Sequence, residues 1–324
     1  MKRLQVDLDL LREFERGLDP QHPERSRMPA RVLGYGEIST VFSIEVEGMR
    51  GLAFKRLPIF HTEEEMAKYQ ATYEEYNRLL ENEIGLCLPP YGYAAFLTDT
   101  GRPIFYIVQQ ELPALSVGNR AIHLLPRQDT LLLVRRVLQE LCKVWEFNRR
   151  QDRWQVAIDG QISNWAIDGF DPEQPRLAEQ ARLYYMDTST PLFRVQGKEQ
   201  LNPELFLRSA PFFLAWLLRS LFLEDVVNRY YDFHRVAVDL VANFYKEQRP
   251  DLISDAVVVV NEVFSRDAPH LGVPLITEAE VRSYYREDAF IWSFYLSARK
   301  VDRFLRTRIL RQEYPYILPE KIQR

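Results

Sequence analysis

Residues 159–167, DGQISNWAI, form a polar loop that runs directly into a short apolar strand. The loop carries two oxygen-bearing side chains five residues apart, Asp159 and Asn164. A second apolar stretch, 183–186 (LYYM), ends at Asp187. Taken singly, each feature is compatible with a plain turn or a helix cap, since Asp, Gly and Asn favour both. Their meaning depends on what the rest of the chain places around them.

Upstream of this loop, the sequence predicts strands. Residues 31–57 read as an antiparallel meander with a turn at 47–51. Between the first two strands lies 34–41, GYGEISTV, whose glycines allow the backbone to approach phosphate oxygens closely. An ordinary turn is the alternative for this loop. Lys55 stands inside the apolar strand LAFKRL (52–57), where an edge-strand lysine facing water is the alternative to a functional role.

Helical patterns dominate the remainder of the chain. Residues 6–18 predict a short leading helix, and 62–82 predict a helix that begins with a Thr62/Glu65 capping box. After a buried strand at 103–110, further helices are expected at 130–149, 203–248, 253–263 and 278–311, with one strand pair at 164–167 and 181–186. A strand-rich first third followed by a helical remainder indicates an α+β protein of two lobes. The expected organisation is a leading helix and linker (1–27), a first lobe (28–112) and a helical second lobe (113–324).

The composition excludes several classes of function. The 324 residues carry 42 Lys and Arg against 46 Asp and Glu, a formal net charge of −4, so nucleic acid and anionic membranes are not expected partners. The two cysteines, Cys87 and Cys142, are too few for a disulfide framework and are not clustered with histidines as a structural zinc site requires. The longest apolar run, 210–218, is shorter than a spanning helix, and no signal-peptide pattern opens the chain. We therefore expect a cytoplasmic protein.

The order of these features is more specific than any one of them. A glycine loop, a strand lysine, a helix with glutamates, an Asp-x-x-x-x-Asn loop and a strand-terminal Asp follow one another along residues 30–190. In this order the chain resembles the protein-kinase-like superfamily, and in pattern it is closest to aminoglycoside phosphotransferases and choline kinases. The resemblance implies a two-lobed fold with a small antiparallel β-rich N-lobe and a larger, mainly helical C-lobe.

The resemblance also implies ATP and Mg²⁺ as cofactors and a role for each matching residue. Asp159 would be the catalytic base, Lys55 would bind the α- and β-phosphates, and Glu75 would hold Lys55, with Glu74 as the rival. Asn164 and Asp187 would be the metal ligands. The remaining nucleotide contacts would come from the glycine loop and from the hinge at 107–112, namely Gly34, Gly36, Ser39, Val41, Gln110 and Leu112.

Departures from the protein-kinase pattern narrow the expected activity. Ala157 and Ile158 replace the usual His-Arg before the catalytic aspartate, and Thr188 and Ser189 replace Phe-Gly after Asp187. They favour a phosphotransferase that moves the γ-phosphate of ATP to a hydroxyl of a small molecule. The alternatives are a pseudokinase, which binds nucleotide as a regulatory or interaction module without turnover, and a nucleotidyl transferase. The identity of the acceptor and the oligomeric state are not encoded in these motifs.

Overall fold

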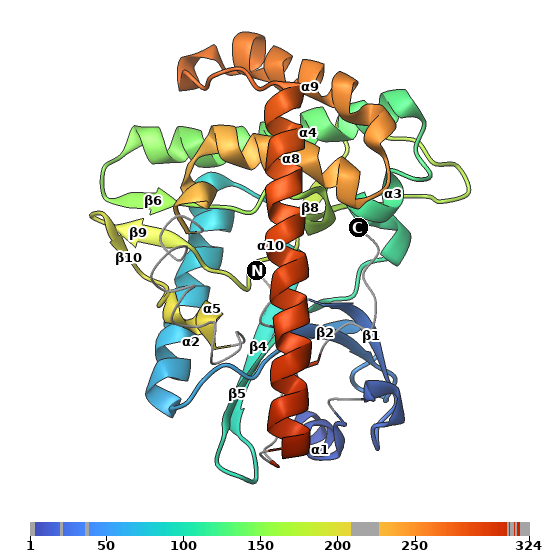
Figure 1. Ribbon diagram of the computed structural model, residues 1–324, viewed down its shortest axis with the longest axis vertical. Coiled ribbons are helices and arrows are strands. Elements are labelled where there is room, and N and C mark those ends of the chain that lie inside the picture. The colour runs from blue at the N-terminus through green and yellow to red at the C-terminus, as the bar shows by residue number, and fades with distance from the viewer. Residues whose placement is uncertain are drawn as a thin grey trace.

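A five-stranded antiparallel sheet forms the first lobe of the computed structural model, which describes residues 4–19, 22–35, 39–208, 227–309, 311, 314 and 316–317. The strand order is β1-β2-β3-β5-β4 (Figure 1). The strands are β1 (Ala30–Tyr35), β2 (Thr40–Ile44), β3 (Leu52–Leu57), β4 (Tyr91–Leu97) and β5 (Pro103–Gln110). The predicted meander is therefore present as β1, β2 and β3, and the predicted strand at 103–110 is β5.

Strand β4 was not predicted. Its sequence, YGYAAFL, contains Gly92, and a glycine lowers the strand signal. The structure gives the reason for that glycine, because a Cβ on Gly92 would lie 2.5 Å from the carbonyl oxygen of Leu4. The Leu4 amide donates a hydrogen bond of 3.0 Å to Tyr91. The start of the chain thus runs against β4, and this close approach requires a residue without a side chain.

Each face of the sheet is covered by one helix. Helix α1 (Leu8–Gly17) buries Leu11 and Phe14 against one face. Helix α2 (Glu63–Arg78) lies on the other face with a stripe of buried tyrosines. At the predicted cap of α2, Thr62 Oγ1 accepts from the Glu65 amide, and the Glu65 carboxylate accepts from the amide of His61.

The second lobe is mainly helical. Its helices are α3 (Gly118–Ala121), α4 (Arg127–Arg150), α5 (Glu204–Leu207), α8 (Phe233–Lys246), α9 (Ile253–Glu262) and α10 (Glu278–Phe304). Two small sheets accompany them: β7 (Trp165–Ile167) with β8 (Leu183–Tyr185), and β6 (Trp154–Val156) with β9 (Phe193–Val195) and β10 (Lys198–Glu199). The predicted strand pair corresponds to β7 and β8, whereas the three-stranded sheet was not predicted. Part of the helix expected at 203–248, residues 209–226, lies outside the described residues.

The α+β, two-lobed fold class is confirmed, with a β-rich first lobe and a helical second lobe (Figure 1). The helical lobe has a continuous core, to which α4, α8 and α9 contribute Leu138, Leu141, Val241, Phe244 and Val260, all fully buried. No helix in the described ranges has the length and apolar character needed to cross a bilayer. Both cysteines are free, and Cys142 is buried.

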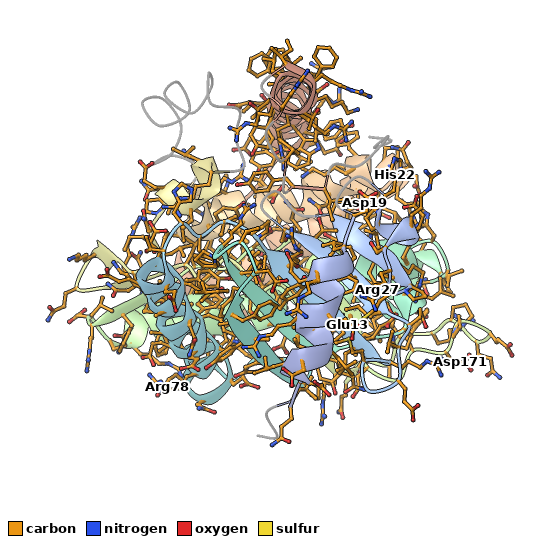
Figure 2. All side chains as sticks on the ribbon, turned by 90° about the horizontal axis from the view of Figure 1, so that it is seen from below. Glu13, Asp19, His22, Arg27, Arg78 and Asp171 are labelled. Carbon is orange, nitrogen blue, oxygen red and sulfur yellow. The ribbon has the colours of Figure 1, made fainter. Side chains whose placement is uncertain are left out.

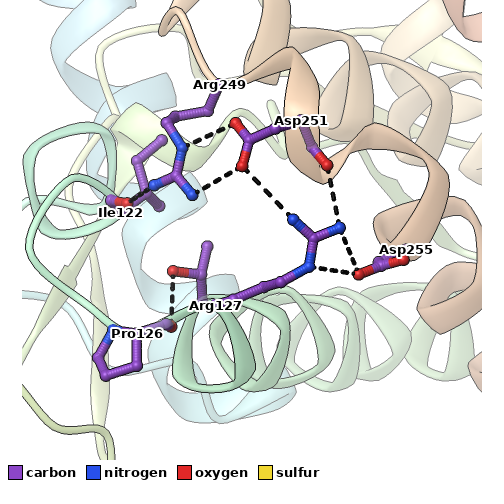
Figure 3. A network of polar contacts seen from close by, with 7 residues as sticks. Ile122, Pro126, Arg127, Arg249, Asp251 and Asp255 are labelled. Atoms are coloured by element: carbon purple, nitrogen blue, oxygen red, sulfur yellow. Dashed lines mark hydrogen bonds and ion pairs between the residues drawn. The ribbon is translucent and has the colours of Figure 1, made fainter.

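An arginine network joins the start of α4 to α9, far along the chain (Figure 3). Arg127 donates to Asp255 at 2.7 Å and to the carbonyl oxygen of Asp251 at 3.0 Å. Arg249 donates to both carboxylate oxygens of Asp251, at 3.0 and 3.1 Å. The network is largely exposed, and exposed ion pairs contribute about 0 to 1 kcal/mol each. The apolar core already holds the two helices together. The network adds polar contacts that favour one alignment of the helices.

Helix α10 is unusual in position. Its 27 residues span about 40 Å at 1.5 Å per residue. In Figure 1 it runs from the helical lobe, where it packs on α8, down past the sheet to the neighbourhood of α1. Its start has the full capping box of Thr277 and Glu280. Beyond it, Ile317 is buried in the same apolar cluster as Leu11 and Phe14 of α1, so the C-terminal part of the chain also packs on the first lobe.

Candidate active site

An ion pair between the two lobes forms the centre of the site. The Lys55 Nζ atom lies 2.6 Å from Asp187 Oδ1, across a sequence separation of 132 residues. Lys55 is paired with Val41 and Ile107 in the sheet, and strand alternation directs it to the face opposite its neighbour Arg56. Asp187 follows β8 by two residues. The structure therefore brings together two of the residues that the sequence predicted.

The chain after β8 holds Asp187 in place. The amide and the hydroxyl of Ser189 both donate to Asp187 Oδ1, at 3.2 and 2.7 Å. Burial alone would raise the pKa of Asp187, but Lys55 and Ser189 outweigh it and lower that pKa below the usual value. Asp187 is therefore ionised at neutral pH. Sequence reasoning gave Ser189 no role, because a serine two residues after an aspartate is common in turns.

Asp159 lies in a small pocket together with Asp187, and Tyr185, Thr190 and Tyr230 are also part of its lining. Asp159 accepts a hydrogen bond of 3.1 Å from the amide of Gln161. The pocket thus brings together the expected base and one expected metal ligand from two separate segments of the chain.

The electrostatic surroundings of Asp159 change its acidity. Burial, the nearby Asp239 of α8 and the charge of Asp187 raise the pKa of Asp159 to about 7, while the Gln161 amide and Arg229 oppose the shift. The Gln161 side chain also donates to Asp239 at 2.9 Å, which links the loop to α8. A carboxyl group with a pKa near 7 can both accept and release a proton at neutral pH.

Asn164 and Asp187 lie at the same end of the β7–β8 pair. Trp165 pairs with Tyr185, and the Met186 amide donates to the Asn164 carbonyl at 2.8 Å. The Asn164 side-chain amide donates to the Asp159 carbonyl at 3.3 Å. Within the described part of the chain, no group of three or more His, Cys, Asp and Glu side chains is arranged to hold a metal. Mg²⁺ takes few protein ligands and prefers oxygen, so this amide and carboxylate suit it chemically.

The structure corrects the expected partner of Lys55. Glu75 binds Arg78 on its own helix, at 2.9 and 3.0 Å, and Glu74 accepts from the hydroxyl of Tyr93. Neither glutamate contacts Lys55, whose ion pair is with Asp187. The physical reason is helical geometry: the buried face of α2 is occupied by its tyrosines, and both glutamates lie off that face.

Tyrosines of α2 contact the site in place of a glutamate. The Tyr69 hydroxyl donates to the carbonyl of Ser189 at 2.7 Å, and the Tyr76 hydroxyl donates to the carbonyl of Ala157 at 2.8 Å. These bonds connect α2 to the segments that carry Asp187 and Asp159. The sequence showed the tyrosines as an apolar stripe but gave no indication of what their hydroxyl groups bind.

The segments that the sequence predicts to bind nucleotide are described in part. Gly34 lies near the end of β1, and Ser39 and Val41 lie at the start of β2; Gly36 is outside the described residues. Gln110 is the last residue of β5. Leu112 lies in the connection after it, which is neither helix nor strand, where the hinge was expected. The side chain of Gln109 donates to the Met186 carbonyl at 2.9 Å, which ties the hinge strand to the strand that leads to Asp187. These residues keep their roles as predictions.

The topology and the Lys55–Asp187 ion pair define an α+β protein whose two lobes meet at the site. The chain belongs to a family of unknown function, DUF6206, whose model matches residues 20–303. No curated protein matches it.

Three solved structures are similar to the chain. WaaP in complex with acyl carrier protein has 17% identity and a TM-score of 0.34, over 83% of this chain and 99% of that one. The GDP complex of aminoglycoside 2'-phosphotransferase-IIIa has 11% identity and a TM-score of 0.31, over 81% and 100%. An amicoumacin kinase in complex with AMP-PNP and Ca²⁺ has 12% identity and a TM-score of 0.31, over 87% and 92%.

Proposed function

We propose that this protein is an ATP- and Mg²⁺-dependent phosphotransferase that moves the γ-phosphate to a hydroxyl of a small-molecule acceptor. One observation carries the proposal: the Lys55–Asp187 ion pair lies between the lobes, and Asp187 shares a pocket with Asp159. A strand lysine, a strand-terminal aspartate and a loop aspartate are the set that positions and neutralises a transferring phosphoryl group.

Each residue has a defined task in this reaction. Lys55 binds phosphate oxygens. Asn164 and Asp187 would hold Mg²⁺, which would offset negative charge on the phosphates. Asp159 accepts the proton of the acceptor hydroxyl. In the same step the hydroxyl oxygen bonds to the γ-phosphorus, and the bond between the γ-phosphorus and ADP breaks. A base with a pKa of about 7 is half ionised at neutral pH, which suits that proton transfer.

A second candidate function is nucleotide binding without turnover. It is favoured by the partner of Lys55: the lysine pairs with Asp187, and α2 contributes tyrosine hydroxyls to the site where a helix carboxylate was expected. In this alternative the same nucleotide site serves a regulatory or interaction module. Turnover distinguishes the two functions, whereas binding does not.

The test measures the thermal shift with ATP, with and without Mg²⁺, for the wild type and three variants. A ligand at ~100 times its Kd adds about 2.7 kcal/mol to the free energy of unfolding, which is a visible shift. Asp187→Asn should lose the Mg²⁺-dependent shift. Asp159→Asn should keep the shift and lose ATP turnover against a panel of hydroxyl-bearing metabolites.

The matched control is Asp171→Asn. Asp171 lies in an exposed loop and is labelled in Figure 2. It should behave as the wild type in binding and turnover. The proposal fails if the wild type shows no Mg²⁺-dependent shift, or if Asp187→Asn retains it. Wild-type binding without phosphorylation of any acceptor would favour the second candidate function.

A further inference from the structure

Helix α10 is held to the body of the protein along one side. Tyr285 stacks on Tyr245 of α8 with ring centroids 4.7 Å apart, and Asp288 lies 3.1 Å from Lys246. Further along, Ala298 and Arg299 are buried. Figure 2 views the molecule along this helix, which stands out from the body at the top, with side chains extending into solvent on its outer side. The outer side is the feature of interest.

The outer side of α10 carries an apolar stripe. Phe290 is 73% exposed, Phe294 and Val301 are 51% exposed, and Phe304 is 57% exposed. Their spacing of four, seven and three residues is that of a coiled-coil seam, and the exposed Ser297 occupies the position between Phe294 and Val301. Single exposed apolar residues are ordinary in soluble proteins, but four in line on one helix indicate an interaction surface.

The stripe is symmetric about Ser297. Phe294 and Val301 lie on either side of it at nearly equal distances along the helix, and so do Phe290 and Phe304. A second copy of α10 in the antiparallel direction would therefore place Phe290 against Phe304 and Phe294 against Val301. An interface of this kind is self-complementary, as a two-fold dimer requires.

The charges beside the stripe favour the antiparallel direction. Exposed Glu287 lies beyond Phe290, and exposed Arg308 lies beyond Phe304 at about the same distance from Ser297. Antiparallel pairing brings Glu287 of one copy to Arg308 of the other. Parallel pairing would bring Arg308 against Arg308 of the second copy and Glu287 against Glu287, and like charges repel.

We propose that this protein forms a two-fold homodimer through the outer face of α10, with the two helices antiparallel. The stripe exposes on the order of 400 Å² of apolar surface per chain, so that a dimer with its polar flanks would bury on the order of 1,000 Å² in total. An interface at this lower end of the usual range dissociates on dilution. The inference is independent of the proposed phosphotransferase activity.

The first experiment measures the mass of the full chain by sedimentation over a hundredfold range of concentration. The wild type should shift from monomer to dimer as the concentration rises. Phe294→Glu places a charge in the stripe and should keep the protein monomeric throughout. Val258→Glu is the matched control, because Val258 is 56% exposed on helix α9, away from the stripe, and it should dimerise as the wild type does.

The second experiment tests direction and register. Ser297→Cys should form a disulfide-linked dimer under mild oxidation, because the two copies of residue 297 face each other, whereas Ser265→Cys on another exposed surface should not. Glu287→Arg and Arg308→Glu should each weaken the dimer, and the double variant should restore it. Circular dichroism confirms that each variant is folded.

Two results would overturn the proposal. One is a wild type that stays monomeric over the whole concentration range, which would mean that another protein, a lipid surface or another part of this chain covers the stripe. The other is a dimer that survives Phe294→Glu or fails to crosslink at residue 297, which would place the interface elsewhere.

Discussion

Two consecutive residues of β3 form two ion pairs on opposite faces of the same sheet. Arg56 donates to Glu15 of α1 at 2.8 Å, and the two side chains are 6% and 8% exposed. Lys55 donates to Asp187 at 2.6 Å, and those side chains are 17% and 29% exposed. The chemistry of the two pairs is similar, but their surroundings are not.

The Arg56–Glu15 pair is closed. Tyr106 also donates to Glu15, and although burial would raise the pKa of Glu15, Arg56 outweighs it and lowers that pKa. This pair therefore holds α1 to the sheet, and its two side chains are almost fully buried. Asp187 of the second pair lines the pocket that also contains Asp159, and both members of this pair are more exposed than Arg56 and Glu15. The comparison teaches that an ion pair by itself does not mark a candidate site, whereas its exposure and the second carboxylate beside it do.

The largest effect on stability is expected at the closed pair. Arg56→Met leaves Glu15 buried without its partner, and breaking a buried pair in this way costs about 3 to 5 kcal/mol of the free energy of unfolding. Lys55→Met should cost about 1 kcal/mol, because the open pair is partly hydrated. Urea unfolding of both variants measures the difference.

The double variant Arg56→Met with Glu15→Met serves as the control for the closed pair. Replacing both members with apolar side chains should recover most of the lost stability, since it removes the unpaired buried charge. Equal losses in Arg56→Met and Lys55→Met would contradict the distinction between the two pairs.

The next effect concerns pH. The pKa of Asp159 is raised to about 7, so ATP turnover should fall about tenfold per pH unit below that value as the base becomes protonated. For stability the sign is opposite: between pH ~4 and about 7 the folded state binds the proton more tightly than the unfolded chain, so Asp159 reduces stability as pH rises through that window. Thermal melts and initial rates from pH 5 to 9 (roughly one pH unit apart) would measure both effects.

Asp239→Asn tests the cause of the raised pKa of Asp159. It removes a charge that raises the pKa of Asp159 while keeping an oxygen for Gln161, so the turnover profile should move to lower pH. A profile that does not move would show that Asp239 has no influence on the base.

The smallest effect is expected from the glutamate that the sequence assigned to Lys55. Glu75→Gln should change turnover less than about twofold and stability less than 0.5 kcal/mol or so, because Glu75 forms only a surface pair with Arg78. A large loss of activity in Glu75→Gln would support Glu75 as the partner of Lys55.

Tyr76→Phe should cost about 1 kcal/mol of the free energy of unfolding, since it removes a buried hydrogen bond to the Ala157 carbonyl.

Local features were predicted well because short stretches encode them. Strand patterns in the sequence predicted β1, β2, β3 and β5 of the first lobe, and Thr62 marked the start of α2. Asp159, Asn164 and Asp187 could be recognised because their loops are short and each sits beside a strand. The strands β4, β6, β9 and β10 were missed because they are short or contain glycine, and the partner of β6 lies almost forty residues further along the chain.

Contacts between distant segments could not be predicted. The sequence placed a glutamate beside Lys55, but helix rotation is decided by which side chains pack on the sheet, and the α2 tyrosines occupy that face. Ser189, Gln161 and Asp239 have no signature of their own, since each acts only through a neighbour in space. The boundaries of the lobes at residues 27 and 112 stay a prediction.

The sequence by itself determined the class of fold and the candidate acid, amide and lysine side chains, because periodicity and turn chemistry act over a few residues. The tertiary structure alone decided that Lys55 meets Asp187, that Asp239 lies close enough to raise the pKa of Asp159, and that α10 presents its phenylalanines to solvent. The physical reason is range: hydrogen bonds, ion pairs and burial depend on distance in space, and the sequence records only distance along the chain.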